Sequence, residues 1–214
     1  MFAVDRDLLM LEPTVFRDVA WTAQRVVNGT GSVAGTTLTL TFQDVDLASA
    51  GVEGGHVALV DGVAYEVVER QSATTATISR VRALATDPVI TPTPATAKPV
   101  SIVTFRPQLA IVHAQVLRML GIEPGVASAA SVVGEGSITN PEALRLAEAL
   151  GALHLVYSAA AALSPVDSPA WARAELYRER FARERQRVVA LIDVDGDGKP
   201  DARRRMNLFQ LERV

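Results

Sequence analysis

The sequence predicts an α+β fold: a helical bundle of about three main helices, a small inserted all-β domain and an extended C-terminal arm. Apolar residues alternate at every second position in much of the first half, and the spacing becomes helical near Phe105. The chain ends in an Asp-rich turn and a short segment of β-like alternation. The segments are an N-terminal segment (1–29), a β domain (30–105), a helical core (106–192) and the turn with its arm (193–214).

The N-terminal segment contains one clear helix pattern. Residues 5–11 are expected to form a short helix that stops near Pro13, because proline cannot continue a helix. Residues 14–27 fit either a helix or a strand. Asn28-Gly29 is a dipeptide typical of turns, and we expect it to end this segment.

The β domain is predicted from alternation and from one hairpin signal. Residues 37–42 alternate strictly, which places Leu38, Leu40 and Phe42 on one face. Asp61-Gly62 separates two apolar runs and is typical of a type I′ hairpin. Further strands are expected over 74–81 and, after a proline-rich spacer at 87–99, over 100–105. Five or so short strands at this spacing suggest a small barrel or sandwich.

The helical core carries three helix patterns. Pro107 suits a first helical turn, and Gly121 suits the position just after a helix C-terminus. Thr139-Asn-Pro-Glu142 is a helix-start signal. We expect helices from Pro107 to Gly121, from Thr139 to about Leu163 and from Ser168 to about Ile192.

The third of these helices is unusually rich in charge. Residues 173–187 contain six arginines and three glutamates, including the favourable pair Glu179 and Arg183. Such a face is often simply solvated, but its length and arginine content also suit a subunit interface. Our candidate interface residues on it are Arg178, Arg183 and Arg187.

Composition and motifs argue against several classes of protein. The 214 residues are 49% apolar with a net charge of −3 and contain no cysteine, so disulfides, thiolate metal sites and Cys nucleophiles are excluded. The start lacks a signal-peptide pattern, and the apolar run 149–163 is too short and polar to span a bilayer. No set of side chains forms a catalytic pattern, and the three histidines lie in separate elements, so we expect no enzyme.

The Asp-rich turn partly matches a calcium loop. Asp193, Asp195, Asp197 and Asp201 stand at positions 1, 3, 5 and 9 of an EF-hand-like loop, and Lys199 would offer its carbonyl at position 7. Position 12 holds an arginine instead of the usual glutamate. Four carboxylates after a helix C-terminus repel one another and oppose the helix dipole. Either a bound cation such as calcium or the arginines at 203–205 could balance them.

The C-terminal half resembles head–tail connector (neck adaptor) proteins of tailed bacteriophages and phage-like particles. The resemblance covers roughly residues 106–214 and rests on AELYRERFARE (174–184), IDVDGDG (192–198) and RRRMNLFQL (203–211). It implies a helical bundle that assembles as a ring, usually twelvefold, below the portal protein. It also implies a C-terminal arm that docks against the portal or a neighbouring neck protein.

These observations lead to an expected function and an alternative. The expected protein is a structural connector of the virion neck, made in the host cytoplasm, through which DNA passes without sequence-specific binding. Its segment 206–214 would add as a strand to a partner. The candidate partner-binding residues of the arm are Arg203, Arg204, Arg205, Leu208, Phe209 and Leu211. The alternative is a calcium-stabilised adhesion or tail-associated binding module.

Overall fold

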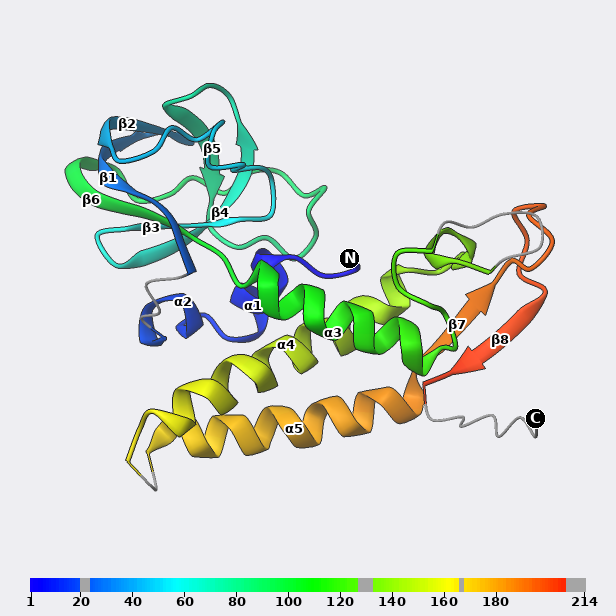
Figure 1. Ribbon diagram of the computed structural model, residues 1–214. Coiled ribbons are helices and arrows are strands. Elements are labelled where there is room, and N and C mark those ends of the chain that lie inside the picture. Colours follow the sequence, from blue (N-terminus) through cyan, green and yellow to red (C-terminus); the bar gives the residue numbers. More distant parts are fainter. Residues whose placement is uncertain (20–23, 127–132, 166–167, 207–214) are drawn as a thin grey trace. The chain divides into compact units, whose positions relative to one another are not determined.

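A computed structural model describes residues 1–19, 24–126, 133–165 and 168–206. The chain forms two compact units (Figure 1). Residues 4–106 make one, called here the barrel unit. Residues 1–3 together with the chain from residue 107 onward make the other, called here the helical unit. The chain therefore passes between the units twice, once after Ala3 and once after Arg106.

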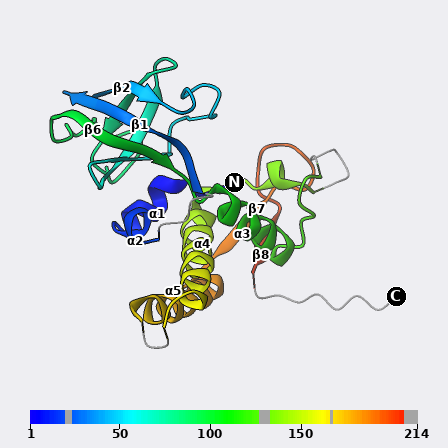
Figure 2. The same cartoon turned by 60° about the vertical axis from the view of Figure 1, so that its left-hand side comes forward.

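The barrel unit is built on a closed, antiparallel, six-stranded barrel with the strand order β1-β2-β5-β4-β3-β6. Figure 2 shows β1 running between its partners β2 and β6. Closure gives every strand a neighbour on both sides, so the barrel has no free sheet edge. The strands are β1 (Arg25–Ala34), β2 (Thr37–Gln43), β3 (Val57–Val60), β4 (Val63–Arg70), β5 (Thr75–Ser79) and β6 (Ala95–Val103).

The predicted hairpin is confirmed. Val60 pairs with Val63, and the two turn residues between them have positive φ angles, 52° at Asp61 and 80° at Gly62. A type I′ turn requires positive φ at both central positions, which Asp and Gly tolerate. The turn thereby sets the register of β3 and β4.

The prediction that Leu38, Leu40 and Phe42 share one face is wrong for Phe42. Leu38 and Leu40 are buried in the barrel, but Phe42 is 70% exposed. Along β1 the partner changes from Phe42 at Thr30 to Leu40 at Gly31, so Thr41 is an extra residue on β2. This bulge reverses the alternation, because one added residue turns the following side chain to the other face.

The predicted turn at Asn28-Gly29 is also wrong, since both residues lie within β1. A Cβ atom at Gly29 would lie 2.0 Å from the carbonyl oxygen of Phe42 on β2. Glycine is therefore required there for the close approach of two strands rather than for a turn. Residues 14–27, which fitted either a helix or a strand, contain both. They include α2 (Val15–Asp18) and the start of β1.

Helix α1 (Asp5–Leu11) is the short helix expected before Pro13, and it carries charged residues that are buried. The carboxylate of Glu66, 1% exposed, accepts a hydrogen bond from Arg6 Nε at 2.5 Å and another from Arg82 Nε. Arg82 also donates to the carbonyl of Asp87 at 2.7 Å. One carboxylate on β4 thus joins α1 to the segment that follows β5.

The helical unit contains three long helices and a β-hairpin. The sequence predicted the helices α3 and α4, and Gly121, with φ of 67°, follows the end of α3 as expected. Tyr157 on α4 stacks on Tyr177 of α5, with ring centroids 5.7 Å apart. The elements are α3 (Arg106–Met119), the 3₁₀ turn η2 (Glu135–Ser137), α4 (Glu142–Ala162), α5 (Pro169–Arg187), β7 (Val189–Ile192) and β8 (Ala202–Arg205).

The predicted continuation of the third helix to Ile192 is wrong, because α5 ends at Arg187 and a strand follows. The Asn140 side chain accepts a hydrogen bond from the N–H of Leu191 at 2.7 Å and donates to the carbonyl of Val189 at 3.0 Å. These bonds and the pairing of β7 with β8 hold the backbone extended.

The predicted fold class is therefore contradicted. The molecule has a closed six-stranded barrel with its own helices, not a helical bundle carrying a small β insertion. The described part of the C-terminal segment is not an extended arm, since 202–205 form β8 and Met206 is only 4% exposed. Residues 207–214 lie outside the described part of the chain.

Asp5 makes the stability of the barrel unit sensitive to pH. Its carboxyl is buried and accepts hydrogen bonds from the Thr104 hydroxyl at 2.6 Å and the Phe105 N–H at 2.7 Å. Burial raises the pKa of Asp5 from 3.8 to about 6, although both hydrogen bonds lower it. The folded unit therefore binds this proton more tightly than the unfolded chain. Its stabilising effect is complete below the unfolded pKa and is lost as pH rises through about 6.

We expect Asp5→Asn to gain stability relative to the wild type as pH rises from about 3.5 to about 7.5, since it lacks this ionisation. The rise in the pKa of Asp5 on folding corresponds to a change of about 3 kcal/mol in the difference between the unfolding free energies of the variant and the wild type. Urea unfolding of both proteins at each pH, followed by circular dichroism, measures that difference. A difference that stays constant with pH would contradict the assignment.

Candidate functional site

The β7–β8 hairpin positions the Asp-rich loop. The two strands pair from Val189 with Arg205 to Ile192 with Ala202, and residues 193–201 form the loop between them. Glycines supply the turn, with φ of 82° at Gly196 and 83° at Gly198. The loop is therefore the tip of a short ladder rather than the start of an arm.

Backbone N–H groups already bind most of the carboxylates of this loop. Asp193 accepts the N–H groups of Gly196 at 2.7 Å and Gly198 at 2.8 Å, one on each oxygen. The hydrogen bond from Gly198 is the main reason why the pKa of Asp193 lies below its usual value. Asp195 accepts the N–H of Asp197, and Asp197 accepts that of Lys199. These bonds orient the carboxylates at the tip of the hairpin.

Three of the predicted metal ligands come together. Asp193, Asp195 and Asp197 each place a carboxylate oxygen within 4.8 Å of the others, so the group could hold a metal ion. Of the other two predicted ligands, Asp201 is not in this group, and Lys199 was expected to contribute its backbone carbonyl. Asp201 accepts the N–H of Val194 at 2.9 Å, and the Lys199 ammonium lies 3.8 Å from Asp197.

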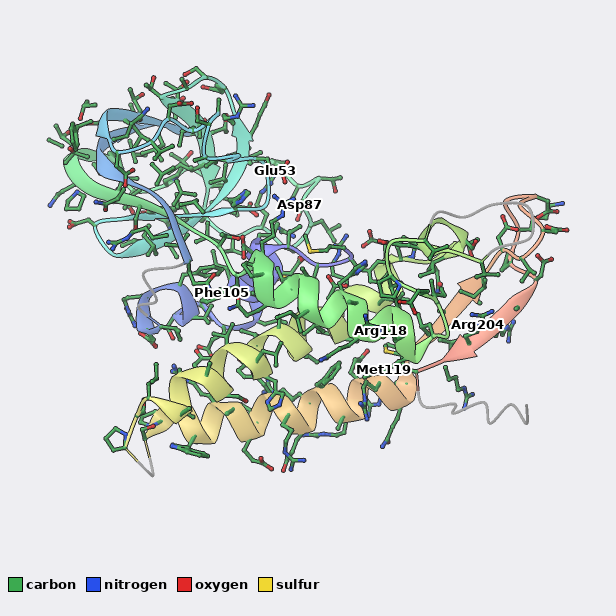
Figure 3. The ribbon with its side chains drawn as sticks, viewed as in Figure 1. Glu53, Asp87, Phe105, Arg118, Met119 and Arg204 are labelled. Atoms are coloured by element: carbon green, nitrogen blue, oxygen red, sulfur yellow. The ribbon has the colours of Figure 1, made fainter. Side chains whose placement is uncertain are left out.

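The arginines do not balance these carboxylates within the described residues. Arg204 points away, and its Nη1 donates to the carbonyls of Leu120 at 2.8 Å and Gly121 at 3.1 Å. Figure 3 shows Arg204 on β8 beside the end of α3, where Arg118 and Met119 are labelled. Arg203 and Arg205 are exposed, and no ion pair in the described ranges joins them to the Asp-rich loop. Arg204 thus binds carbonyls left unpaired at a helix end.

Helix α5 is the most exposed long helix of the unit. Only Ala174 and Tyr177 of its nineteen residues are buried. Trp171 is 48% exposed and Leu176 is 38% exposed, so apolar surface is available between the charged groups. A helix of this length is roughly 28 Å long, and most of its circumference is open in the single chain.

The candidate interface arginines lie on the open side of α5. Arg178 pairs with Glu175 at 2.5 Å and Arg183 with Glu179 at 3.7 Å, and the side chains of both arginines are more than half exposed. Arg187 is exposed at the end of the helix. The other three arginines of α5 lie over aromatic rings of the unit, Arg173 over Tyr157, Arg180 over Tyr177 and Arg185 over Phe181.

The remaining predicted partner-binding residues, Leu208, Phe209 and Leu211, lie outside the described residues. Sequence reasoning missed Asn140, which fixes β7, and it missed the contact of Arg204 with α3. Both contacts join residues more than forty positions apart, and no local spacing could have indicated them.

Comparisons with protein families, curated proteins and solved structures found no match to this chain. Among the helices of the described residues, none has the length and apolar character that a bilayer crossing requires.

We expect Arg204→Ala to lower the unfolding free energy by about 1–2 kcal/mol, because two carbonyls after α3 lose their charged donor. Arg203→Ala is the matched control on the same strand, where the side chain is exposed, and its effect should stay below about 0.5 kcal/mol. Urea unfolding measures both variants. Equal effects would show that Arg204 contributes no more than a surface arginine.

Proposed function

We propose that this protein is a structural connector of a phage neck that assembles as a ring, in which copies meet through α5. The observation that carries the proposal is the helix itself, nineteen residues long with two buried. Its open side mixes arginine, glutamate, Trp171 and Leu176. Aromatic residues and arginine are enriched in protein interfaces relative to the rest of the surface.

Ring assembly needs two different surfaces that fit each other, because each copy contacts one neighbour on each side. The helical unit carries surfaces of opposite charge, the arginines of α5 and the carboxylates of the loop at 193–197. The acidic loop of one copy can therefore approach the arginines of the next. Such complementarity would orient the copies and exclude a symmetric pairing of two arginine faces.

The family resemblance supplies the remaining parts of the proposal. The ring would be twelvefold, lie below the portal protein and offer a platform to the next neck or tail protein. DNA would pass through it without sequence-specific contacts, and the protein would reside in the virion neck. Residues 207–214, with Leu208, Phe209 and Leu211, would dock on the portal or on a neighbouring neck protein.

The double variant Arg178→Ala, Arg183→Ala should fold normally but lose ring assembly, because both side chains are more than half exposed and pair with glutamates of their own helix. Negative-stain imaging of the purified protein and of assembled particles measures the fraction of rings. Circular dichroism reports the fold.

The matched control is Arg17→Ala, which removes an exposed arginine of the barrel unit that pairs with Asp18. It should assemble as the wild type does. Rings that persist in the double variant, or a wild type that stays monomeric even in particles, would defeat the interface assignment.

A second candidate function is a calcium-stabilised adhesion or tail-associated binding module. The observation that favours it is the convergence of Asp193, Asp195 and Asp197, since carboxylate oxygens are the ligands that calcium prefers. Asp201, which is not among the three, would have to move to complete the site. A monomer or small oligomer that needs calcium would separate this function from a connector ring.

We expect calcium to raise the melting temperature of the wild type, with a Kd of about 10⁻⁴–10⁻³ M for so exposed a site. Asp195→Asn should abolish this shift, because it removes one of three ligand charges. Asp61→Asn, in the β3–β4 turn, is the control and should respond as the wild type does. Thermal unfolding of the three proteins with and without calcium measures these melting temperatures. A wild-type melting temperature that calcium does not raise would rule out the metal site.

A further inference from the structure

A buried carboxylate in the helical unit holds the first residues of the chain. Glu148, in the second turn of α4, is fully buried. Its oxygens accept the backbone N–H of Phe2 at 3.2 and 3.3 Å and that of Ala3 at 3.2 Å. The ring Nδ1 of His113 on α3 lies 2.9 Å from the same carboxylate. Each of these groups can donate a hydrogen bond to Glu148, as burial of a carboxylate requires.

The same histidine makes two further contacts with this segment. The ring of Phe2 lies against the ring of His113, with centroids 4.7 Å apart. Nε2 of His113 lies 3.1 Å from an oxygen of Glu135 in η2. That distance suits an ion pair, but the angle does not make a hydrogen bond, and Nε2 has no hydrogen-bond partner among the described residues. The contact between His113 and Glu135 therefore depends on charge rather than on hydrogen-bond geometry.

The electrostatics follow from this arrangement. Burial by itself lowers the pKa of His113, but the carboxylates of Glu148 and Glu135 outweigh it and raise the pKa above 6.5. Burial would raise the pKa of Glu135, but His113 and the amino group of Met1, 3.2 Å away, lower it. The charged imidazolium is thus the form that the closed arrangement favours.

We propose that His113, Glu135 and Glu148 form a peptide-binding site, filled in this chain by residues 1–3, that releases its peptide as pH rises. The site recognises two successive main-chain N–H groups and an aromatic side chain between α3 and α4. The charged groups that face His113 within the described residues are Glu148 from α4, Glu135 from η2 and the amino group of Met1. We call these three side chains with residues 1–3 the N-terminal clasp.

The direction of the pH effect follows from His113. Below the pKa of the released histidine, near 6.5, the imidazolium attracts both carboxylates and the clasp is closed. Above the raised pKa of the closed state the ring is neutral, and its Nε2 lone pair faces the oxygen of Glu135. For each unit by which the closed clasp raises the pKa of His113, the closed state becomes about tenfold less stable as pH rises across this interval.

Release changes how the two units are linked. With the clasp closed, residues 1–3 belong to the helical unit, and the chain connects the units after Ala3 and again after Arg106. With the clasp open, only the second connection remains. The site therefore makes the number of chain connections between the two units depend on pH.

Hydrogen exchange of the Phe2 and Ala3 amides, measured by NMR on the full chain and corrected for intrinsic rates, tests the proposal. Between about pH 5.5 and about pH 8.5, both amides should lose protection in the wild type. In His113→Gln the protection should be lower at the acid end and should vary less with pH than in the wild type. Protection that is independent of pH in the wild type, or a pH dependence as large in His113→Gln as in the wild type, would overturn the proposal.

Two further variants separate the clasp from general destabilisation. Glu148→Gln keeps the size of the side chain but loses one acceptor oxygen, so protection of Phe2 and Ala3 should fall while the amides of β3 and β4 keep theirs. His154→Gln is the matched control, since His154 on α4 contacts the Ala174 carbonyl and takes no part in the clasp. It should leave the pH profile of both amides unchanged, and a profile altered to the same extent as in His113→Gln would also refute the proposal.

Discussion

A carboxylate removed from water must be met by donors inside the protein, and this requirement determines how the N-terminal residues are attached in both units. In the barrel unit, Glu66 is met by Arg6 on α1 and by Arg82 after β5. In the helical unit, Glu148 is met by two backbone N–H groups and a histidine. In each case one buried acid joins segments that are far apart in the sequence, and removing its donors would leave the charge uncompensated.

Local chemistry accounts for what could be predicted of the fold. The Asp61-Gly62 turn, the α3 stop at Gly121 and the start of α5 at Pro169 each depend on the backbone preferences of one or two residues. The errors have long-range causes. Thr41 is extra in β2 only because β1 pairs on both sides of it, and α5 stops because β8 and Asn140 compete for the backbone after Arg187. The periodicity of apolar residues contains no information about these long-range contacts.

The same distinction between local and long-range causes applies to the candidate site. The spacing of aspartates correctly indicated that Asp193, Asp195 and Asp197 would converge, because a tight Gly-rich loop leaves them little choice. The positions of Asp201 and Arg204 depended on β8 and on α3, and local spacing contained no information on either. His113 and Glu148 stand in unremarkable helix positions, thirty-five residues apart. Only the folded unit reveals that a buried acid and a histidine share one peptide segment.

The insertion of the barrel unit between residues 3 and 107 has a consequence for synthesis on the ribosome. All six strands have been made once residue 106 has emerged, so the barrel can close while the helices are still being translated. Residues 1–3 bind Glu148, and they must stay unattached until α4 has been made and folded. Residues 1–3 are made before the barrel unit but reach their final place only after it has been completed.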